Sequence, residues 1–446
     1  MTTYAEWIDI SASFLKQGNH KAGMIILDGL ISQYPHDPIA LYLLGSAYLD
    51  KEALGTAITM LEQSCVLGEK MPEPHHNLGV AYRKAERYDE SFESFLRAYN
   101  LDRGRVDTMA MLSGGFVNRG NPGPGVEWAR KCLEAEPGHP HAMNHMALCL
   151  MEQGKWDEAW PYWEKRWLHP DRAMNVRSYG ASVPKWDGSE LQGTLVIHGE
   201  QGLGDEIMFM SCFPRVKAKR IVIECAERLA PLFERSFGVK CYPNHQALME
   251  AEQDIDAWIP MGDLPFLLGV ERAGRFLEPI EADHRFERPT VGLAWFGGTA
   301  KTHSKLRNPS VEAFADLVKR VEGVNFVSVQ YNSEDAEGEA ERIGVEHDPE
   351  LAADFDRLTA KIDACDMIVS VLQTAVHQAG GLGKRCLVST PKACPWPFQL
   401  DGPMPWYESV ELIRQKEERS SSPLGWNGVF DEIAAQVQIL TERKAA

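Results

Sequence analysis

The residues best suited to chemistry lie in the stretch 194–214, TLVIHGEQGLGDEIMFMSCFP, where Asp205 ends a turn that contains Gly199, Gly202 and Gly204. The apolar residues before the turn predict a buried strand, and those after it predict a helix that the final proline closes. Such a turn presents backbone N–H groups, and its glycines let a ligand come close. A carboxylate placed there can act as a general base. We therefore predict this role for Asp205, with Gly202 and Gly204 beside it in the pocket.

An equally supported interpretation gives Asp205 the structural role of capping the helix that follows the turn. The two best-known phosphate loops are excluded. The stretch lacks the Gly-Lys-Ser/Thr ending of a P-loop, and the positions of its glycines do not spell G-x-G-x-x-G. The choice between base and cap therefore depends on the rest of the chain.

Basic residues without acidic neighbours occupy the window 289–310. It contains no Asp or Glu, although the chain has 64 acidic residues. Its basic side chains follow a Gly-Gly pair on a predicted loop, where a diphosphate would accept charge-assisted hydrogen bonds. We therefore predict Lys305 and Arg307 as phosphate-binding residues, and Trp295 and Gly297 as residues of the pocket wall.

A second window without acidic residues covers 367–400. Part of this composition is structural, because buried parallel strands exclude charge. The predicted strand DMIVSV leads into a helix start, where N–H groups and the Thr374 hydroxyl are suited to hold phosphate oxygens. His377 follows on the same helix face; a lone histidine is more often a packing residue, but the nearby Gly-Gly pair indicates close backbone approach. The predicted donor-side residues are Gln373, Thr374, Ala375, His377, Gly380 and Gly381.

Three aromatic residues further along have two equally supported interpretations. Trp396, Trp406 and Tyr407 either line a nucleotide or sugar pocket or pack in a core. Large aromatic side chains serve both purposes, so the sequence leaves both open.

The first third of the chain repeats with a period of 34 residues, as the pairs Leu44-Gly45 and Leu78-Gly79 show. The pattern resembles the tetratricopeptide repeat, in which paired helices cross at a small residue. Five units are predicted to start near Tyr4, Pro38, Pro72, Val106 and Pro140. The small residues at the predicted crossings are Gly23, Ala57, Ser91, Gly125 and Ala159.

Stacked helix pairs form a superhelix whose concave groove binds peptides or partner proteins. We favour partner binding over the alternative that the array only supports the next domain. His141 and His145 lie four residues apart on a predicted repeat helix, a spacing that can hold a metal. Without a third ligand nearby they are interpreted as helix-surface histidines, and no metal is predicted.

The periodicity changes after the repeats. Turn-forming and polar residues in 171–192 predict a linker or wrapping loop. Short β-branched runs then alternate with helical stretches, which implies parallel sheets. A break near 281–289 divides this region, so the predicted domains are a repeat array (1–170), a linker (171–192), a first Rossmann-like half with Asp205 (193–285) and a donor-side half (286–446), with a ligand cleft between the halves. The predicted strands are Leu195–Ile197, Ile221–Ile223, Val239–Tyr242, Ala257–Ile259, Val291–Trp295, Asn325–Gln330, Met367–Val371, Cys386–Val388 and Val410–Ile413.

The composition excludes several classes of protein. A formal net charge of −18 argues against binding nucleic acid by general electrostatics. The nine cysteines include no C-x-x-C pair, which favours a reducing compartment and argues against a zinc site or a disulfide framework. No apolar run has membrane-spanning length, and the first residues lack the pattern of a secretion signal. We expect a cytoplasmic protein without a transmembrane segment.

Four segments in this order resemble tetratricopeptide-repeat glycosyltransferases: GEQGLGDEIMFMSCFP, VGLAWFGG…HSKLRNPS, VSVLQTAVHQAGGLGK and PMPWYESVELIRQ. The catalytic part of these enzymes is similar to the ADP-heptose heptosyltransferases (family 9-like) and has the GT-B fold, a pair of Rossmann-like domains. The resemblance covers nearly the whole chain and implies an α-helical solenoid followed by α/β domains. It implies Asp205 as the base, Lys305 or Arg307 as a donor-phosphate contact, and Thr374 and His377 beside the diphosphate.

One departure concerns the donor sugar. Heptosyltransferases often carry Asp directly before the Thr-containing turn, whereas this chain has Leu372-Gln373 there. The sequence therefore assigns neither the sugar nor the nucleotide.

The resemblance implies an inverting, metal-independent glycosyltransferase of the hexosyl or heptosyl type. It would move a sugar from a nucleotide-sugar, a co-substrate rather than a cofactor, to a hydroxyl of a protein or surface-glycan acceptor. The repeat groove would recognise the protein or peptide acceptor or another partner. The alternative is a catalytically inactive tetratricopeptide adaptor, but the presence of Asp205, Arg307 and His377 favours the enzyme.

Overall fold

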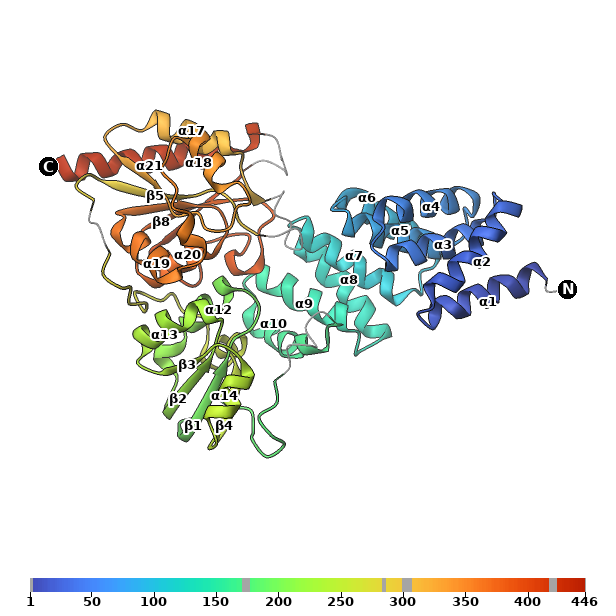
Figure 1. Ribbon diagram of the computed structural model, residues 1–446, viewed down its shortest axis with the longest axis horizontal. Helices are drawn as coiled ribbons and strands as arrows, with labels where there is room; N and C mark the ends of the chain where they lie inside the picture. The colour runs from blue at the N-terminus through green and yellow to red at the C-terminus, as the bar shows by residue number, and fades with distance from the viewer. Residues whose placement is uncertain (1–2, 171–176, 283–285, 299–306, 417–422, 446) are drawn as a thin grey trace. The chain divides into compact units, whose positions relative to one another are not determined.

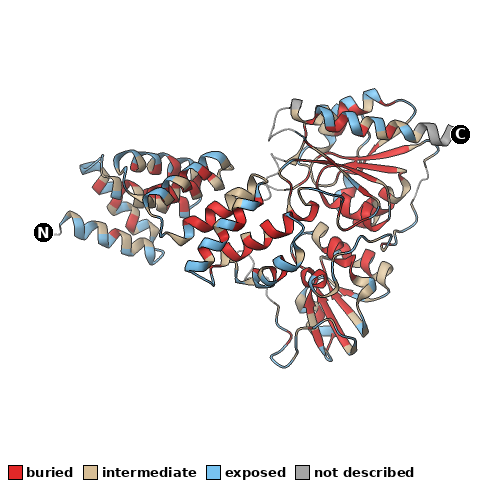
Figure 2. Cartoon of the chain, turned by 180° about the vertical axis from the view of Figure 1, so that it is seen from behind, coloured by how far each residue is buried: buried red, intermediate tan, exposed pale blue. Residues whose placement is uncertain are grey.

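A computed structural model describes residues 3–170, 177–282, 286–298, 307–416 and 423–445 (Figure 1). The chain forms two compact units, a repeat unit of residues 1–149 and a sheet unit of residues 150–446. Each unit has its own buried residues, on the facing sides of the helices in the first and along the strands in the second (Figure 2).

Paired helices build the repeat unit. The first helix of each pair begins at a predicted repeat start, and equivalent helices begin 34 residues apart, so the five predicted starts are confirmed. The helix α10 (Trp156–Trp163) keeps this period but belongs to the sheet unit. The other helices are α1 (Tyr4–Lys16), α2 (His20–Gln33), α3 (Pro38–Asp50), α4 (Leu54–Leu67), α5 (Pro72–Lys84), α6 (Tyr88–Leu101), α7 (Val106–Asn118), α8 (Pro122–Ala135) and α9 (Pro140–Glu152).

Small residues let the two helices of a pair approach closely. A Cβ atom on Gly79 would lie 2.8 Å from the Phe95 ring, so only glycine fits there. Serines at equivalent crossings use the short distance for a hydrogen bond. The Ser91 hydroxyl donates to the Gly79 carbonyl at 2.7 Å, and the Ser113 hydroxyl donates to the Gly125 carbonyl at 2.8 Å.

The first sheet of the sheet unit has four parallel strands in the order β3-β2-β1-β4. Because β1 is central and its neighbours lead away in opposite directions, a crevice is expected between the carboxyl ends of β1 and β4. The strands are β1 (Leu191–His198), β2 (Ala218–Glu224), β3 (Lys240–Tyr242) and β4 (Ala257–Pro260), and the helices are α12 (Leu203–Met210), α13 (Ala230–Phe237), α14 (His245–Ala251) and α15 (Leu264–Leu268).

The second sheet has five parallel strands in the order β6-β5-β7-β8-β9. The helices α17, α18 and α21 cover one face, where they form the core with the strands, and α19 and α20 cover the other (Figure 1). The elements are β5 (Thr290–Ala294), α17 (Val311–Arg320), β6 (Asn325–Ser328), α18 (Ala336–Ile343), α19 (Phe355–Ala364), β7 (Met367–Ser370), α20 (Thr374–Gly381), β8 (Cys386–Thr390), β9 (Val410–Arg414) and α21 (Asn427–Ala445).

All nine predicted strands are confirmed to within a few residues, and the expected layout of a helical repeat array followed by parallel sheets is confirmed with them. Helices cover both faces of a parallel strand, so its residues form a continuous apolar run in the sequence. Such runs between turn-forming residues allowed the strands to be predicted.

The segment between repeats and sheet, as far as it is described, wraps the first sheet. Tyr179 is buried against Val196 and Val222 of the sheet. The Trp186 backbone N–H donates to the Trp258 carbonyl at 2.8 Å, which adds the segment to the edge of β4. Of the two predicted roles, linker or wrapping loop, residues 177–190 have the second.

Candidate functional site

Asp205 lies in the first turn of α12, directly after the glycine turn that follows β1. Its Oδ2 accepts a hydrogen bond from the Gly202 N–H at 3.1 Å, so the carboxylate does cap its helix. Gln201 has a φ of 68°, a left-handed conformation that non-glycine residues rarely adopt. Since strained turns cluster at functional sites, this geometry is compatible with a functional carboxylate as well as with a cap.

The glycine turn lies against the start of α20, which carries the predicted donor-side residues Thr374 and His377. A Cβ atom on Gly204 would lie 2.9 Å from His377 Cδ2 and 3.4 Å from the Thr374 hydroxyl. The helices α12 and α20 lie side by side, and each begins at the carboxyl end of a central strand (Figure 1). The structure therefore brings the turn of Asp205 and the residues Thr374 and His377 together, although more than 160 residues separate them in the sequence.

The N-terminus of α20 is buried and lacks a side-chain cap. Gln373 occupies the N-cap position without a capping hydrogen bond, and its buried Oε1 has no partner among the described residues. The Thr374 hydroxyl shares a 2.7 Å hydrogen bond with the Tyr331 hydroxyl. Ala375 and every other residue of α20 are buried. A buried helix start without a cap is suited to an anion, because its first N–H groups have no partner within the helix.

His377 is held by Tyr407 rather than facing outward. The His377 Nδ1 and the Tyr407 hydroxyl are 3.0 Å apart. Burial lowers the pKa of His377 to about 3, so the ring is neutral at pH 7. Burial also raises the pKa of Tyr407 well above its usual value, and the negative charge of Asp205 adds to this effect.

The glycine pair of α20 serves packing. A Cβ atom on Gly380 would lie 2.3 Å from the Tyr407 ring, and one on Gly381 would lie 2.5 Å from Leu277. The close backbone approach predicted for these glycines is present, but it brings protein side chains, Tyr407 and Leu277, against the helix.

The loop after β5 meets the loop after β7. A Cβ atom on Gly297 would lie 2.6 Å from the Leu372 carbonyl oxygen, so the two loops touch at the crevice between the central strands. Buried Gln330 fixes this crevice: its Oε1 accepts from the N–H groups of Trp295 and Phe296 at 2.9 and 3.0 Å. The Trp295 side chain points away into the core, where its Nε1 donates to Glu339. Neither Gln330 nor Tyr331 was predicted as a site residue, although Gln330 ends the predicted strand Asn325–Gln330 and Tyr331 follows it directly.

Of the two predicted phosphate-binding residues, Lys305 and Arg307, the structure describes only Arg307. Lys305 lies outside the described residues, as do Lys301 and His303. Arg307 is described and half-buried.

Trp396 and Trp406 lie in an aromatic core. Both are buried, and both rings contact Trp156 of α10 and Phe209 of α12. The Trp406 indole donates to the Pro397 carbonyl at 2.9 Å. Their surroundings are those of packing residues, the second of the two interpretations that the sequence left open.

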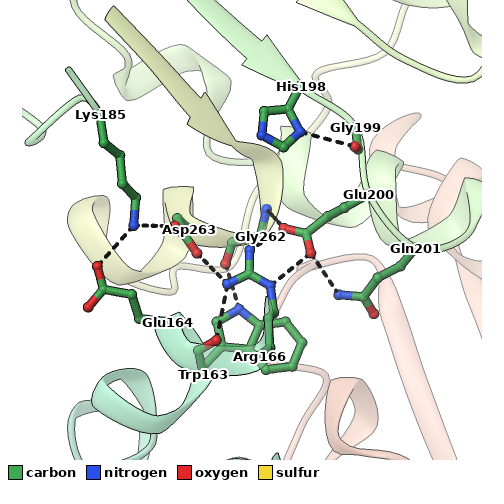
Figure 3. Close-up of polar contacts among 10 residues, drawn as sticks. All are labelled: Trp163, Glu164, Arg166, Lys185, His198, Gly199, Glu200, Gln201, Gly262 and Asp263. Carbon is green, nitrogen blue, oxygen red and sulfur yellow. Dashed lines mark hydrogen bonds and ion pairs between the residues drawn. The ribbon is translucent and has the colours of Figure 1, made fainter. Parts of the chain in front are cut away.

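A buried charge network lies at the crevice of the first sheet (Figure 3). Arg166, in the short helix Glu164–Leu168, is fully buried and donates from Nε to Glu200 at 2.8 Å and from Nη1 to Asp263 at 2.6 Å. Glu200 also accepts from the Gly262 N–H at 2.8 Å, and Lys185 pairs with Asp263 at 2.7 Å. Burial alone would lower the pKa of Arg166, but the two carboxylates outweigh it and raise that pKa.

This network anchors the glycine turn. Glu200 belongs to that turn, and Gly262 and Asp263 follow β4, so Arg166 occupies the place where the carboxyl ends of β1 and β4 diverge. A ligand would be expected in such a crevice. At the first sheet Arg166 fills this crevice. At the second sheet the Gln373 side chain and the uncapped start of α20 are the polar groups suited to a ligand.

Comparisons with known proteins support the repeats. The tetratricopeptide repeat family matches residues 72–105. Protein FlbA of Caulobacter vibrioides is 28% identical over 413 residues, which cover 81% of this chain and 66% of FlbA. Solved structures with a likeness to this chain include MamA, with 21% identity, a TM-score of 0.33 and coverage of 37% of this chain and 98% of MamA. Another is YrrB, described as a TPR protein with an unusual peptide-binding site, with 17% identity, a TM-score of 0.34 and coverage of 39% and 90%.

The N-terminal part of the chain therefore contains tetratricopeptide repeats. No helix among the described residues is long and apolar enough to cross a membrane. In the same residues, no group of three or more His, Cys, Asp or Glu side chains is arranged to hold a metal ion.

Proposed function

We propose that the sheet unit is a GT-B type glycosyltransferase that moves a sugar from a nucleotide-sugar to a hydroxyl group of an acceptor, with inversion and without a metal. The observation that carries the proposal is the contact of Gly204 with Thr374 and His377. It joins the only sequence motif with a candidate base to the uncapped helix start that suits a diphosphate. Two Rossmann-like halves that meet through their carboxyl-end loops are the arrangement such a transfer requires.

The donor diphosphate is assigned to the second sheet. Its oxygens would accept hydrogen bonds from the first N–H groups of α20 and from the Thr374 hydroxyl, and Arg307 would add positive charge. The unpartnered Oε1 of Gln373 supports a ligand here, because a buried polar atom without a partner is costly unless something binds it. As the glycosidic bond breaks, these groups would stabilise the charge of the leaving diphosphate.

Asp205 is assigned as the base. Its carboxylate would take the proton of the acceptor hydroxyl, and attack from the face opposite the leaving group would invert the anomeric centre. The hydrogen bond from the Gly202 N–H to Oδ2 orients the carboxylate at the helix start. The role of cap and the role of base are therefore compatible in one side chain.

The repeats are assigned to acceptor or partner recognition. Superhelical repeat arrays commonly bind peptides in their concave groove, and YrrB is described as having a peptide-binding site. A protein acceptor fits this arrangement better than a free sugar, and a partner protein that delivers a surface glycan would use the same groove.

Thermal-shift and transfer assays test the proposal. Binding of one nucleoside diphosphate or nucleotide-sugar is expected to raise the melting temperature, and Arg307→Ala is expected to weaken this effect. Asp205→Asn should retain donor binding and lose transfer by a factor of about 100 or more. Full transfer activity in Asp205→Asn would sink the base assignment.

Gly204→Ala tests the contact that carries the proposal. Its new methyl group would push Thr374 and His377 away, so donor binding and transfer should both fall. Gly274→Ala is the matched control, because a Cβ atom there would meet nothing within 4 Å. Equal donor binding by Gly204→Ala and Gly274→Ala would show that the contact has no part in the site.

A second candidate function is a repeat-based adaptor whose sheet unit has lost catalysis. The capping bond of Asp205 favours it, because a carboxylate that only caps its helix needs no substrate. An adaptor of this kind need not bind any nucleotide-sugar, so the absence of a thermal shift with every donor would favour it over the enzyme.

A further inference from the structure

Arg228 is a cation that sequence analysis did not single out. It lies in the short helix Glu227–Leu229, just beyond the carboxyl end of β2 in the first half. Its guanidinium lies 4.2 Å from the centre of the Phe355 ring and 5.7 Å from that of Tyr331, both residues of the second half. The side chain therefore reaches from one half to aromatic residues of the other.

The aromatic residues lead directly to the start of α20. Tyr331 and Phe355 pack edge to face with ring centres 5.2 Å apart. The Tyr331 hydroxyl bonds to the Thr374 hydroxyl at 2.7 Å. Arg228 is thus one aromatic residue away from the helix start assigned to the diphosphate.

Arg228 has no carboxylate partner among the described residues. Its Nη2 donates to the Ala352 carbonyl, its Nε has no hydrogen-bond partner within the described segments, and burial lowers its pKa. The contrast with Arg235 is direct. Arg235, on α13 of the same half, forms a bidentate ion pair with Asp356 of α19, at 2.5 and 3.1 Å. In a chain with 64 acidic residues, a partly desolvated arginine without a counter-ion needs an explanation.

We infer that Arg228 supplies positive charge from the first half to the phosphate groups of the nucleotide donor, whose binding at α20 is the function proposed above. The bound anion would be the counter-ion that the described part of the chain does not provide. The Phe355 and Tyr331 rings lie beside the guanidinium, and the planar fork of an arginine matches two phosphate oxygens. Because Arg228 and the α20 N-terminus belong to different halves, the donor would also hold the two halves together.

Isothermal titration of the full chain with ADP, UDP and GDP, and with the matching nucleosides, tests the inference. Arg228→Ala is expected to weaken binding of the preferred diphosphate about ten- to hundredfold and to leave binding of its nucleoside unchanged. Arg228→Gln keeps a polar side chain of intermediate length without the charge and should show the same loss, which separates lost charge from lost side-chain bulk. Arg235→Ala, in the same region but paired with Asp356, should leave the diphosphate affinity unchanged.

The outcomes distinguish the two proposals. If the wild type binds a diphosphate and both Arg228 variants bind it equally well, Arg228 has no part in the site and the donor assignment stands. If the variants lose diphosphate and nucleoside binding to the same degree, the role of Arg228 is structural and the inference is overturned. If the wild type binds no diphosphate, both the inference and the proposed function are wrong.

Discussion

At the scale of single residues, the site combines charged groups whose surroundings differ sharply. Asp205 is partly exposed at a helix start, whereas its neighbour Glu206 points inward and is buried. The Glu206 carboxyl occupies the space that a side chain at Gly199 would need. Its Oε2 accepts a hydrogen bond from the Ala226 N–H at 3.0 Å. Burial therefore acts on the ionisation of Glu206.

Glu206 predicts a pH dependence of stability. Burial raises its pKa to about 8, above the value near 4.3 of an unfolded chain. Between these values the folded protein holds a proton that the unfolded chain releases, so the contribution of Glu206 is present below pH 4 and is lost as the pH rises through 8. Glu206→Gln is expected to flatten the fall in unfolding free energy between pH 5 and 8, measured by urea denaturation.

The matched control is Glu252→Gln. Glu252 pairs with Arg220, and that hydrogen bond lowers its pKa, so it stays ionised throughout the range from pH 5 to 8. This variant should lower stability by a similar amount at each pH and keep the slope of the wild type. A slope in Glu206→Gln equal to that of the wild type would contradict the assignment of a buried, protonated Glu206.

At the scale of elements, the candidate site consists of helix starts and of the loops that follow strands. The segment that contains Arg166 holds one of these loops, the glycine turn, in place. The helices α12 and α20 touch through Gly204, while Arg166 ties the glycine turn to the loop after β4. A side chain from the segment after the repeats thus determines where Glu200, and with it the turn of Asp205, is held. Arg166 acts through Glu200 and is a positioning residue.

The substitution Arg166→Met is expected to lower the stability of the sheet unit strongly. The change leaves Glu200 and Asp263 buried without their main counter-ion, which costs about 3–5 kcal/mol. Thermal unfolding and hydrogen exchange in the turn 199–205 measure the effect. Arg320→Met breaks an exposed ion pair with Asp431 and is expected to cost less than about 1 kcal/mol. Equal effects of the two variants would refute the anchoring role of Arg166.

At the scale of the whole molecule, the sequence predicts the features that depend on neighbouring residues or on a repeated pattern, which are the repeat helices and the strands. The 34-residue period predicted every repeat start, and β-branched runs predicted all nine strands, because helix pairing and strand burial impose regular patterns on neighbouring residues. Of the candidate site, the sequence singled out Asp205 and the start of α20, which are motifs of consecutive residues, and their role in a site stays a prediction. The sequence did not predict Arg166, Arg228 or Tyr331, since their partners are distant in the chain and single arginines or tyrosines leave no pattern.

The division into two compact units predicts that the two proposed activities can be separated. Leu44 is buried between α2 and α3, and Leu44→Ala is expected to destabilise the repeat unit by about 2–5 kcal/mol. Because nucleotide binding is assigned to the sheet unit alone, the affinity for the donor should stay within about twofold of the wild type. Transfer to a protein acceptor should fall, because the repeats to which acceptor recognition is assigned would be destabilised.

Hydrogen exchange and two assays check this separation. Exchange should rise in α2 and α3, residues 20–50, and remain unchanged in the strands β5 and β7. Val369→Ala, in the core of the second sheet, is the reciprocal control: it should weaken donor binding and leave exchange in the repeats unchanged. If Leu44→Ala transfers sugar to the protein acceptor at the wild-type rate while its repeats exchange freely, the acceptor is recognised elsewhere and the repeats serve another partner.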